Sequence, residues 1–165
     1  MTGDGGQALR LSRAPSTRVG MLIRRPAPDV FAALTDPALT SRFWFTKSSG
    51  PVTRGAELTW TWEMYEVSSA VSVTDLEEDH LLRFTWSGYD PEHPTTVEFR
   101  FVPRAEGTYV QVTETGFRGD GDTQVSRALD STQGFTFLLS SLKAFLEHDV
   151  VLRVVLDAHP GGLQI

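Results

Sequence analysis

Apolar and polar residues alternate through the middle of the chain, and this pattern predicts β-strands with one buried face. The clearest alternation runs over residues 57–65, where Leu58, Trp60 and Trp62 share one face. Further strands are expected around residues 17–25, 71–73, 82–86, 97–101 and 108–115. Short links rich in turn residues join the later runs, so we expect about six strands arranged mainly as an antiparallel meander.

Two other parts of the chain have apolar residues at helical spacing. Prolines at positions 28 and 37 predict two short helices after the first strand, because a proline favours the first turn of a helix and ends the one before it. Residues 124–148 place an apolar stripe along one side of a long helix. The stripe continues through residues 150–157, which extends the expected helix as far as the sequence AHPGG.

This order of elements indicates an α+β fold in which a curved antiparallel sheet wraps around the long C-terminal helix, because both then bury their apolar faces. A strongly bent sheet often leaves space beneath such a helix, where an apolar ligand would lie. The side chains expected at this position are mostly aromatic on the sheet and aliphatic on the helix. They are Trp60, Trp62, Phe84, Trp86, Phe99, Phe101, Phe135, Leu138, Leu139 and Leu142. Large rings are compatible with a filled core or with a lined pocket, and the sequence leaves both open.

An aromatic segment follows the two short helices, where a turn would ordinarily be polar. Phe43, Trp44 and Phe45 stand where the second helix leads back into the sheet. We expect them to close the open end of the fold against the long helix, either as a lid over a cavity or as a plug on a filled core. Trp44 is therefore a further candidate for ligand binding.

Charge and composition narrow the range of partners. The 165-residue chain has a formal net charge of −6 and no basic stripe, so nucleic acid is not an expected partner. It has no cysteine, which excludes disulfides and thiol chemistry. Its apolar runs are too short for a membrane span. We expect one cytoplasmic domain at residues 17–160, preceded by a flexible leader (1–16) and followed by a short tail (161–165).

The sequence offers few groups for catalysis. Its four histidines are not spaced as metal ligands, and it has no glycine pattern for phosphate or dinucleotide binding, so no metal or cofactor is expected. Glu114 keeps the phase of Val110 and Val112. It is expected either to point inward as a general acid or ligand anchor, or to be solvated where the strand frays. An enzyme would need an inward polar cluster around Glu114, Tyr109 or Arg100.

Four motifs carry a resemblance to a known family. They are VFAALTDPALTSRFWF (30–45), LLRFTW (81–86), GTYVQVTETGF (107–117) and QGFTFLLSSLKAFLEH (133–148). In their order and spacing the chain resembles the START-like helix-grip (SRPBCC) superfamily over roughly residues 17–160, and within it the bacterial homologues of the heat-shock-protein-90 ATPase activator. It differs in having Phe135 where the family often has Trp, and Glu114 where many members have His.

The resemblance implies a helix-grip fold and a ligand site, because members of the superfamily bind lipids, sterols, polyketides or plant hormones. We therefore expect non-enzymatic binding of a small apolar or aromatic molecule, lipid- or polyketide-like, by a monomer or homodimer. One alternative is a polyketide aromatase/cyclase-like enzyme or an antibiotic self-resistance protein. The other is a chaperone-associated or regulatory protein, for which a filled core would be the better fit.

Overall fold

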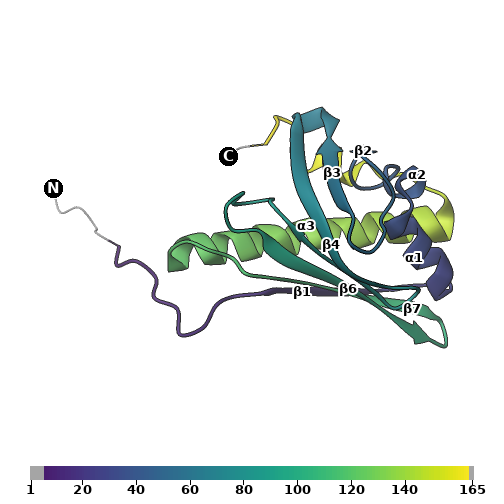
Figure 1. The fold of residues 1–165 in the computed structure, drawn as a ribbon, viewed down its shortest axis with the longest axis horizontal. Helices are drawn as coiled ribbons and strands as arrows, with labels where there is room; N and C mark the ends of the chain where they lie inside the picture. The colour runs from purple at the N-terminus through teal and green to yellow at the C-terminus, as the bar shows by residue number, and fades with distance from the viewer. Residues whose placement is uncertain (1–5, 164–165) are drawn as a thin grey trace.

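The computed structural model describes residues 6–163, and in this part of the chain a single sheet wraps one long helix (Figure 1). The elements are β1 (Thr17–Ile23), α1 (Ala27–Thr35), α2 (Pro37–Thr40), β2 (Lys47–Ser48), β3 (Glu57–Trp62), η1 (Glu63–Tyr65), β4 (Val67–Glu77), β5 (Leu81–Trp86), β6 (Thr95–Arg104), β7 (Gly107–Thr115), α3 (Gly121–His148) and α4 (Val154–Asp157). Within these residues, no helix is both long enough and apolar enough to cross a bilayer.

Every pair of neighbouring strands in the sheet is antiparallel, and the strand order is β1-β7-β6-β5-β4-β3-β2. The predicted meander from β3 to β7 is confirmed. The first strand, β1, pairs with the last, β7, and this pairing places Thr17 opposite Glu114. The sheet has seven strands where about six were expected, because β2 has only two residues and cannot show an alternation.

Helix α3 lies across one face of the curved sheet, and α1 and α2 lie at one end of the grip (Figure 1). The prolines act as predicted, since α1 has Pro28 in its first turn and α2 begins at Pro37. The side chain of Asp36 caps α2 by accepting from the backbone N–H of Ala38 at 3.0 Å. The helix-grip architecture is confirmed.

The prediction that the long helix continues through residues 150–157 is wrong. Helix α3 ends at His148, because Asp149 adopts the left-handed conformation (φ 53°) and its N–H bonds back to carbonyls of the last turn. Arg153 is also left-handed (φ 58°), and only the short α4 follows it. Of the two residues that were expected to prolong the apolar stripe, Val150 is more than a third exposed and Val154 is half-buried. Other apolar residues of this segment are also more than a third exposed: Val151, Leu152 and Leu156. We call residues 149–163 the C-terminal strap.

The core between the sheet and α3 is solidly packed at the end where the short helices lie. Its central side chains are at most 2% exposed: Trp60, Phe84, Phe99, Phe101, Leu138, Leu139 and Leu142. The aromatic segment after α2 closes this end as predicted. Phe43 stacks on Phe145 of α3 with ring centroids 5.5 Å apart, and Phe45 stacks on Trp60 at 4.8 Å. Trp44, between them in the sequence, lines a cavity that is described below.

Candidate functional site: an aromatic cavity beneath the C-terminal strap

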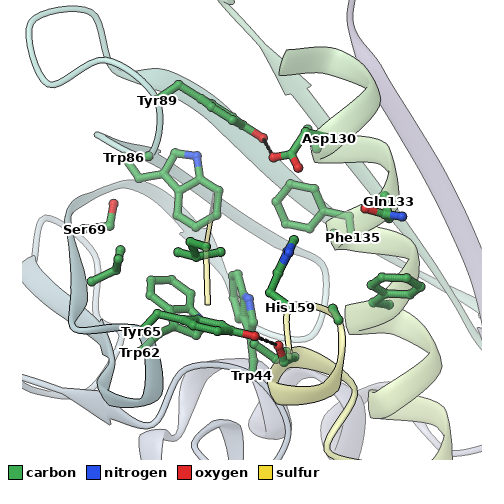
Figure 2. Close-up of a pocket in the computed structure, with 18 of the residues that line it drawn as sticks. Trp44, Trp62, Tyr65, Ser69, Trp86, Tyr89, Asp130, Gln133, Phe135 and His159 are labelled. Atoms are coloured by element: carbon green, nitrogen blue, oxygen red, sulfur yellow. Dashed lines mark hydrogen bonds between the residues drawn. The ribbon is translucent and has the colours of Figure 1, made fainter. Parts of the chain in front are cut away.

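A cavity of about 270 Å³ is lined by residues of β3, η1, β4, β5, β7, α3, the C-terminal strap and the links after α2 and β5. Figure 2 shows its aromatic lining, in which Trp62, Tyr65, Trp86 and Phe135 surround a common space. With Trp44, the cavity holds three of the four tryptophans of the chain. Its volume lies just below the range of roughly 300–1,000 Å³ that is usual for small-molecule sites. It therefore has room for a small organic molecule.

The tryptophans and Phe135 support one another as a continuous wall. The ring centroids of Trp62, Trp86 and Phe135 lie 6.1, 6.0 and 6.2 Å from that of Trp44. These separations, with tilted or edge-on planes, are typical of favourable aromatic pairs. Trp44 is held in turn by Trp60 of the core at 5.1 Å. The wall is thus preformed, since each ring is fixed by a neighbouring ring.

Glu114, on the inner face of β7, is fully buried and is one of the residues that line the cavity. Its Oε2 accepts hydrogen bonds from Trp86 Nε1 and Thr95 Oγ1, both at 2.7 Å, and its Oε1 accepts from Ser131 Oγ at 2.6 Å. One carboxylate therefore joins β5, β6, β7 and α3, and it fixes the indole ring of Trp86. We call these four side chains the Glu114 network.

A second polar pair lies at the rim of the cavity. The hydroxyl of Tyr89, in the link between β5 and β6, donates to Oδ2 of Asp130 on α3 at 2.8 Å (Figure 2). Burial raises the pKa of the Tyr89 hydroxyl, and the hydrogen bond to Asp130 raises it further. Tyr89 thus remains a neutral donor, and the pair links the β5–β6 segment to the long helix.

The C-terminal strap forms the outer side of the cavity, where Val155, Ala158, His159 and Leu163 contribute to its lining. The hydroxyl of Tyr65 donates to the backbone carbonyls of Val155 and Leu156, the latter at 3.0 Å. Burial raises the pKa of this hydroxyl, which keeps it a donor. The anchor matters because the strap has little regular structure of its own.

Replacing Tyr65 with Phe should loosen the strap while leaving the core intact. The substitution removes only the hydroxyl, and one hydrogen bond of this kind contributes about 1 kcal/mol. We expect faster amide hydrogen exchange in residues 154–163 and little change in α3. Hydrogen-exchange mass spectrometry measures both segments at once. Unchanged exchange in the strap would show that Tyr65 does not anchor it.

The structure divides the residues that the sequence proposed for the site. Those that line the cavity are Trp44, Trp62, Trp86, Glu114 and Phe135. Those that lie in the core and do not line it are Trp60, Phe84, Phe99, Phe101, Leu138, Leu139 and Leu142. Tyr109 and Arg100 project from the other face of the sheet, where Arg100 pairs with Glu98. The inward polar cluster around Glu114 is therefore made by Trp86, Thr95 and Ser131.

Several lining residues were not found by sequence reasoning: Tyr65, Ser69, Tyr89, Asp130 and His159. The alternation over residues 57–65 placed Tyr65 on the polar face of a strand, but the strand ends at Trp62 and Tyr65 lies in η1. Tyr89, Asp130 and His159 lie in a link, on an exposed turn of α3 and in the strap, where periodicity gives no signal. Ser69 is the exception, because it shares the phase of Val71 and Val73 on β4. Its hydroxyl is buried and has no hydrogen-bond partner among the described residues. Residues 6–163 contain no group of three His, Cys, Asp or Glu side chains that could hold a metal.

Solved structures share this fold. A protein from Staphylococcus saprophyticus is 30% identical (TM-score 0.71) over 84% of this chain and 96% of its own. The Aha1 dimer from Colwellia psychrerythraea is 20% identical (TM-score 0.67) over 81% and 97%, respectively. DynU16, described as a putative protein in the dynemicin biosynthetic locus, is 22% identical with a TM-score of 0.73. The match covers 82% of this chain and 48% of DynU16. Among curated proteins, no sequence matches this one.

The family assignment rests on the central part of the chain. Residues 24–147 match the family described as "Activator of Hsp90 ATPase homolog 1-like protein". They include both short helices, β2 to β7 and nearly all of α3. The sequence resemblance and the shared fold thus agree, and this chain belongs to the family of proteins similar to the activator of Hsp90 ATPase.

Proposed function

We propose that this protein binds a small apolar or aromatic molecule, without covalent chemistry, in the cavity between the sheet and α3. The main support for this proposal is the preformed aromatic wall around a cavity of about 270 Å³. Aromatic walls with a few placed polar groups are typical of small-molecule sites. Trp44, Trp62, Trp86 and Phe135 would contact the ligand, and Glu114 would hold the wall from behind.

The polar groups of the site support binding in a defined orientation. The buried hydroxyl of Ser69, 4% exposed, lacks a partner among the described residues. Buried polar groups of this kind are ordinarily hydrogen-bonded, so a ligand atom that bonds to Ser69 would satisfy it. The Tyr89–Asp130 pair offers further polar atoms at the rim. The ligand would therefore have an apolar body with a small number of polar groups.

Two further observations support this proposal over the alternatives. A fully filled core would have favoured the chaperone-associated or regulatory alternative, in which the protein acts through its surface. The cavity favours binding of a small molecule instead. The fold neighbour from the dynemicin biosynthetic locus agrees with a ligand from small-molecule biosynthesis, such as a lipid- or polyketide-like compound. Because another fold neighbour was determined as a dimer, a homodimer is proposed beside the monomer as the state that binds.

Filling the cavity should weaken binding strongly without unfolding the protein. In Ser69→Phe the new ring would enter the cavity from β4, and the affinity for a neutral probe such as phenylnaphthylamine should fall by a factor of about ten or more. Ala70→Phe is the matched control, since its side chain is exposed on the other face of the same strand. A fluorescence titration gives both affinities.

The proposal fails if the wild-type protein does not bind the probe, or if Ser69→Phe binds it as well as Ala70→Phe does. Native mass spectrometry of protein purified from its own host gives an independent measurement. A co-purified small molecule that is lost in Ser69→Phe would identify the natural ligand.

A further inference from the structure

The charged side chains that line the cavity are of one sign. Asp130 and Glu114 are acidic, and neither Lys nor Arg occurs among the described residues that line it. Besides two tyrosines, the remaining titratable group of the lining is His159. The described lining therefore offers a ligand two acidic side chains and no Lys or Arg.

Among residues 6–163, no cationic side chain is in hydrogen-bond contact with the Glu114 carboxyl group. All three groups that donate to it belong to the neutral side chains of Trp86, Thr95 and Ser131. Neither acidic side chain of the lining, Glu114 or Asp130, forms an ion pair with a basic side chain in the described part of the chain.

One basic side chain, Arg127, lies over the ring of Tyr89 at the rim and also bonds to a backbone carbonyl. The guanidinium carbon of Arg127 lies 5.9 Å from the ring centroid of Tyr89, and its Nη1 donates to the backbone carbonyl of Arg118 at 3.0 Å. Arg127 does not line the cavity. Asp130 accepts from the neutral Tyr89 hydroxyl, so its negative charge also remains available to a ligand.

The aromatic lining is of the kind that attracts cations. A cation is drawn to the face of an aromatic ring by the ring quadrupole, and tryptophan is the best of the three aromatic side chains for this contact. Trp44, Trp62 and Trp86 all line the cavity, with Tyr65 on the same side (Figure 2). Aromatic cages that bind organic ammonium groups use this contact, and a carboxylate beside the rings adds an electrostatic attraction.

We propose that the ligand of this cavity carries a protonated amine on an apolar, largely flat body, an inference that rests on the binding function proposed above. The ammonium group would lie near Asp130 and Phe135 of α3, with Trp86 of β5 across the cavity from them (Figure 2). The apolar body would lie against Trp44 and Trp62. Anionic ligands would be disfavoured, because they would meet two carboxylates.

Three probes with the same ring body test the charge preference: naphthylmethylammonium, naphthylmethanol and naphthoate. Isothermal titration calorimetry at about pH 8, where amines of this kind are protonated and carboxylates are ionised, should rank their affinities in that order. We expect the ammonium to bind about fivefold more tightly than the alcohol, and naphthoate to bind more weakly than both. Equal affinities would overturn this inference and leave the binding function standing. Absence of binding by all three would overturn both.

The variant Asp130→Asn locates the ammonium group. Asp130 is exposed on α3, and Asn can still accept from Tyr89, so the fold should be retained. We expect its affinity for naphthylmethylammonium to fall about threefold more than its affinity for naphthylmethanol. Asp79→Asn removes the same charge from a turn that does not line the cavity, and it should change neither affinity. Equal losses in the two variants, or no loss in Asp130→Asn, would contradict the assignment.

Discussion

Replacing Glu114 with Ala should lower the free energy of unfolding by about 3 kcal/mol. The substitution leaves the donors of Trp86, Thr95 and Ser131 without their common acceptor, and each unsatisfied buried donor costs roughly 1–3 kcal/mol. Loss of an unbalanced buried carboxylate offsets part of that cost. The net effect remains large because one side chain joins three strands to α3.

Glu114→Gln is the matched control for this prediction. Its side-chain oxygen can accept from Trp86, and its amide can donate to the hydroxyl of Ser131 or Thr95. We therefore expect a loss of only about 1 kcal/mol. Urea unfolding of both variants measures the two free energies. A loss below about 1 kcal/mol in Glu114→Ala would show that solvent from the cavity satisfies the three donors and that the carboxylate is dispensable for stability.

The link between Glu114 and Trp86 can be separated from the rest of the network. Trp86→Phe removes the indole donor while keeping an aromatic ring in the wall. In a double-mutant cycle with Glu114→Ala, the two substitutions should be coupled by roughly 0.5–3 kcal/mol, as expected for residues in direct contact. Additive losses would mean that Glu114 does not hold the indole ring.

The alternation of residues predicts which face of the sheet a side chain lies on, and it succeeds for the strands. Glu114 lies inward because it keeps the phase of Val110 and Val112. Alternation does not predict whether an inward-facing residue lies in the filled core or at the cavity. Phe84 and Trp86 share one face of β5, yet Phe84 is fully buried in the core and Trp86 lines the cavity. The difference depends on which turn of α3 lies opposite, and a one-dimensional pattern does not contain that information.

The C-terminal strap shows a second limit of sequence patterns. The apolar spacing of residues 150–157 fits a continued helix, but the left-handed conformations of Asp149 and Arg153 redirect the chain. Tyr65 then contacts a segment some ninety positions away, through hydrogen bonds to Val155 and Leu156. No local periodicity reports such a contact. The outer side of the cavity was therefore missed, whereas its inner wall was largely proposed from sequence.

Truncating Phe99 should destabilise the protein far more than truncating Trp62, although both are aromatic residues of the inner face. Phe99 is 0% exposed and packs against Phe84 and Phe135, with ring centroids at 6.2 and 5.9 Å. Phe99→Ala should therefore lower the free energy of unfolding by about 3–5 kcal/mol. Trp62 is only half-buried at the cavity, so we expect Trp62→Ala to cost about 1–2 kcal/mol.

Ligand binding should follow the opposite order, and this separates a core residue from a wall residue. Trp62→Ala should weaken phenylnaphthylamine binding by about tenfold, because it removes a ring face from the cavity. Phe99→Ala, measured under conditions where it remains folded, should retain most of the affinity, since Phe99 does not line the cavity. Urea unfolding and fluorescence titration of the same two proteins provide the comparison. If Trp62→Ala loses as much stability as Phe99→Ala and keeps its affinity, the aromatic wall is core packing and the cavity is not the binding site.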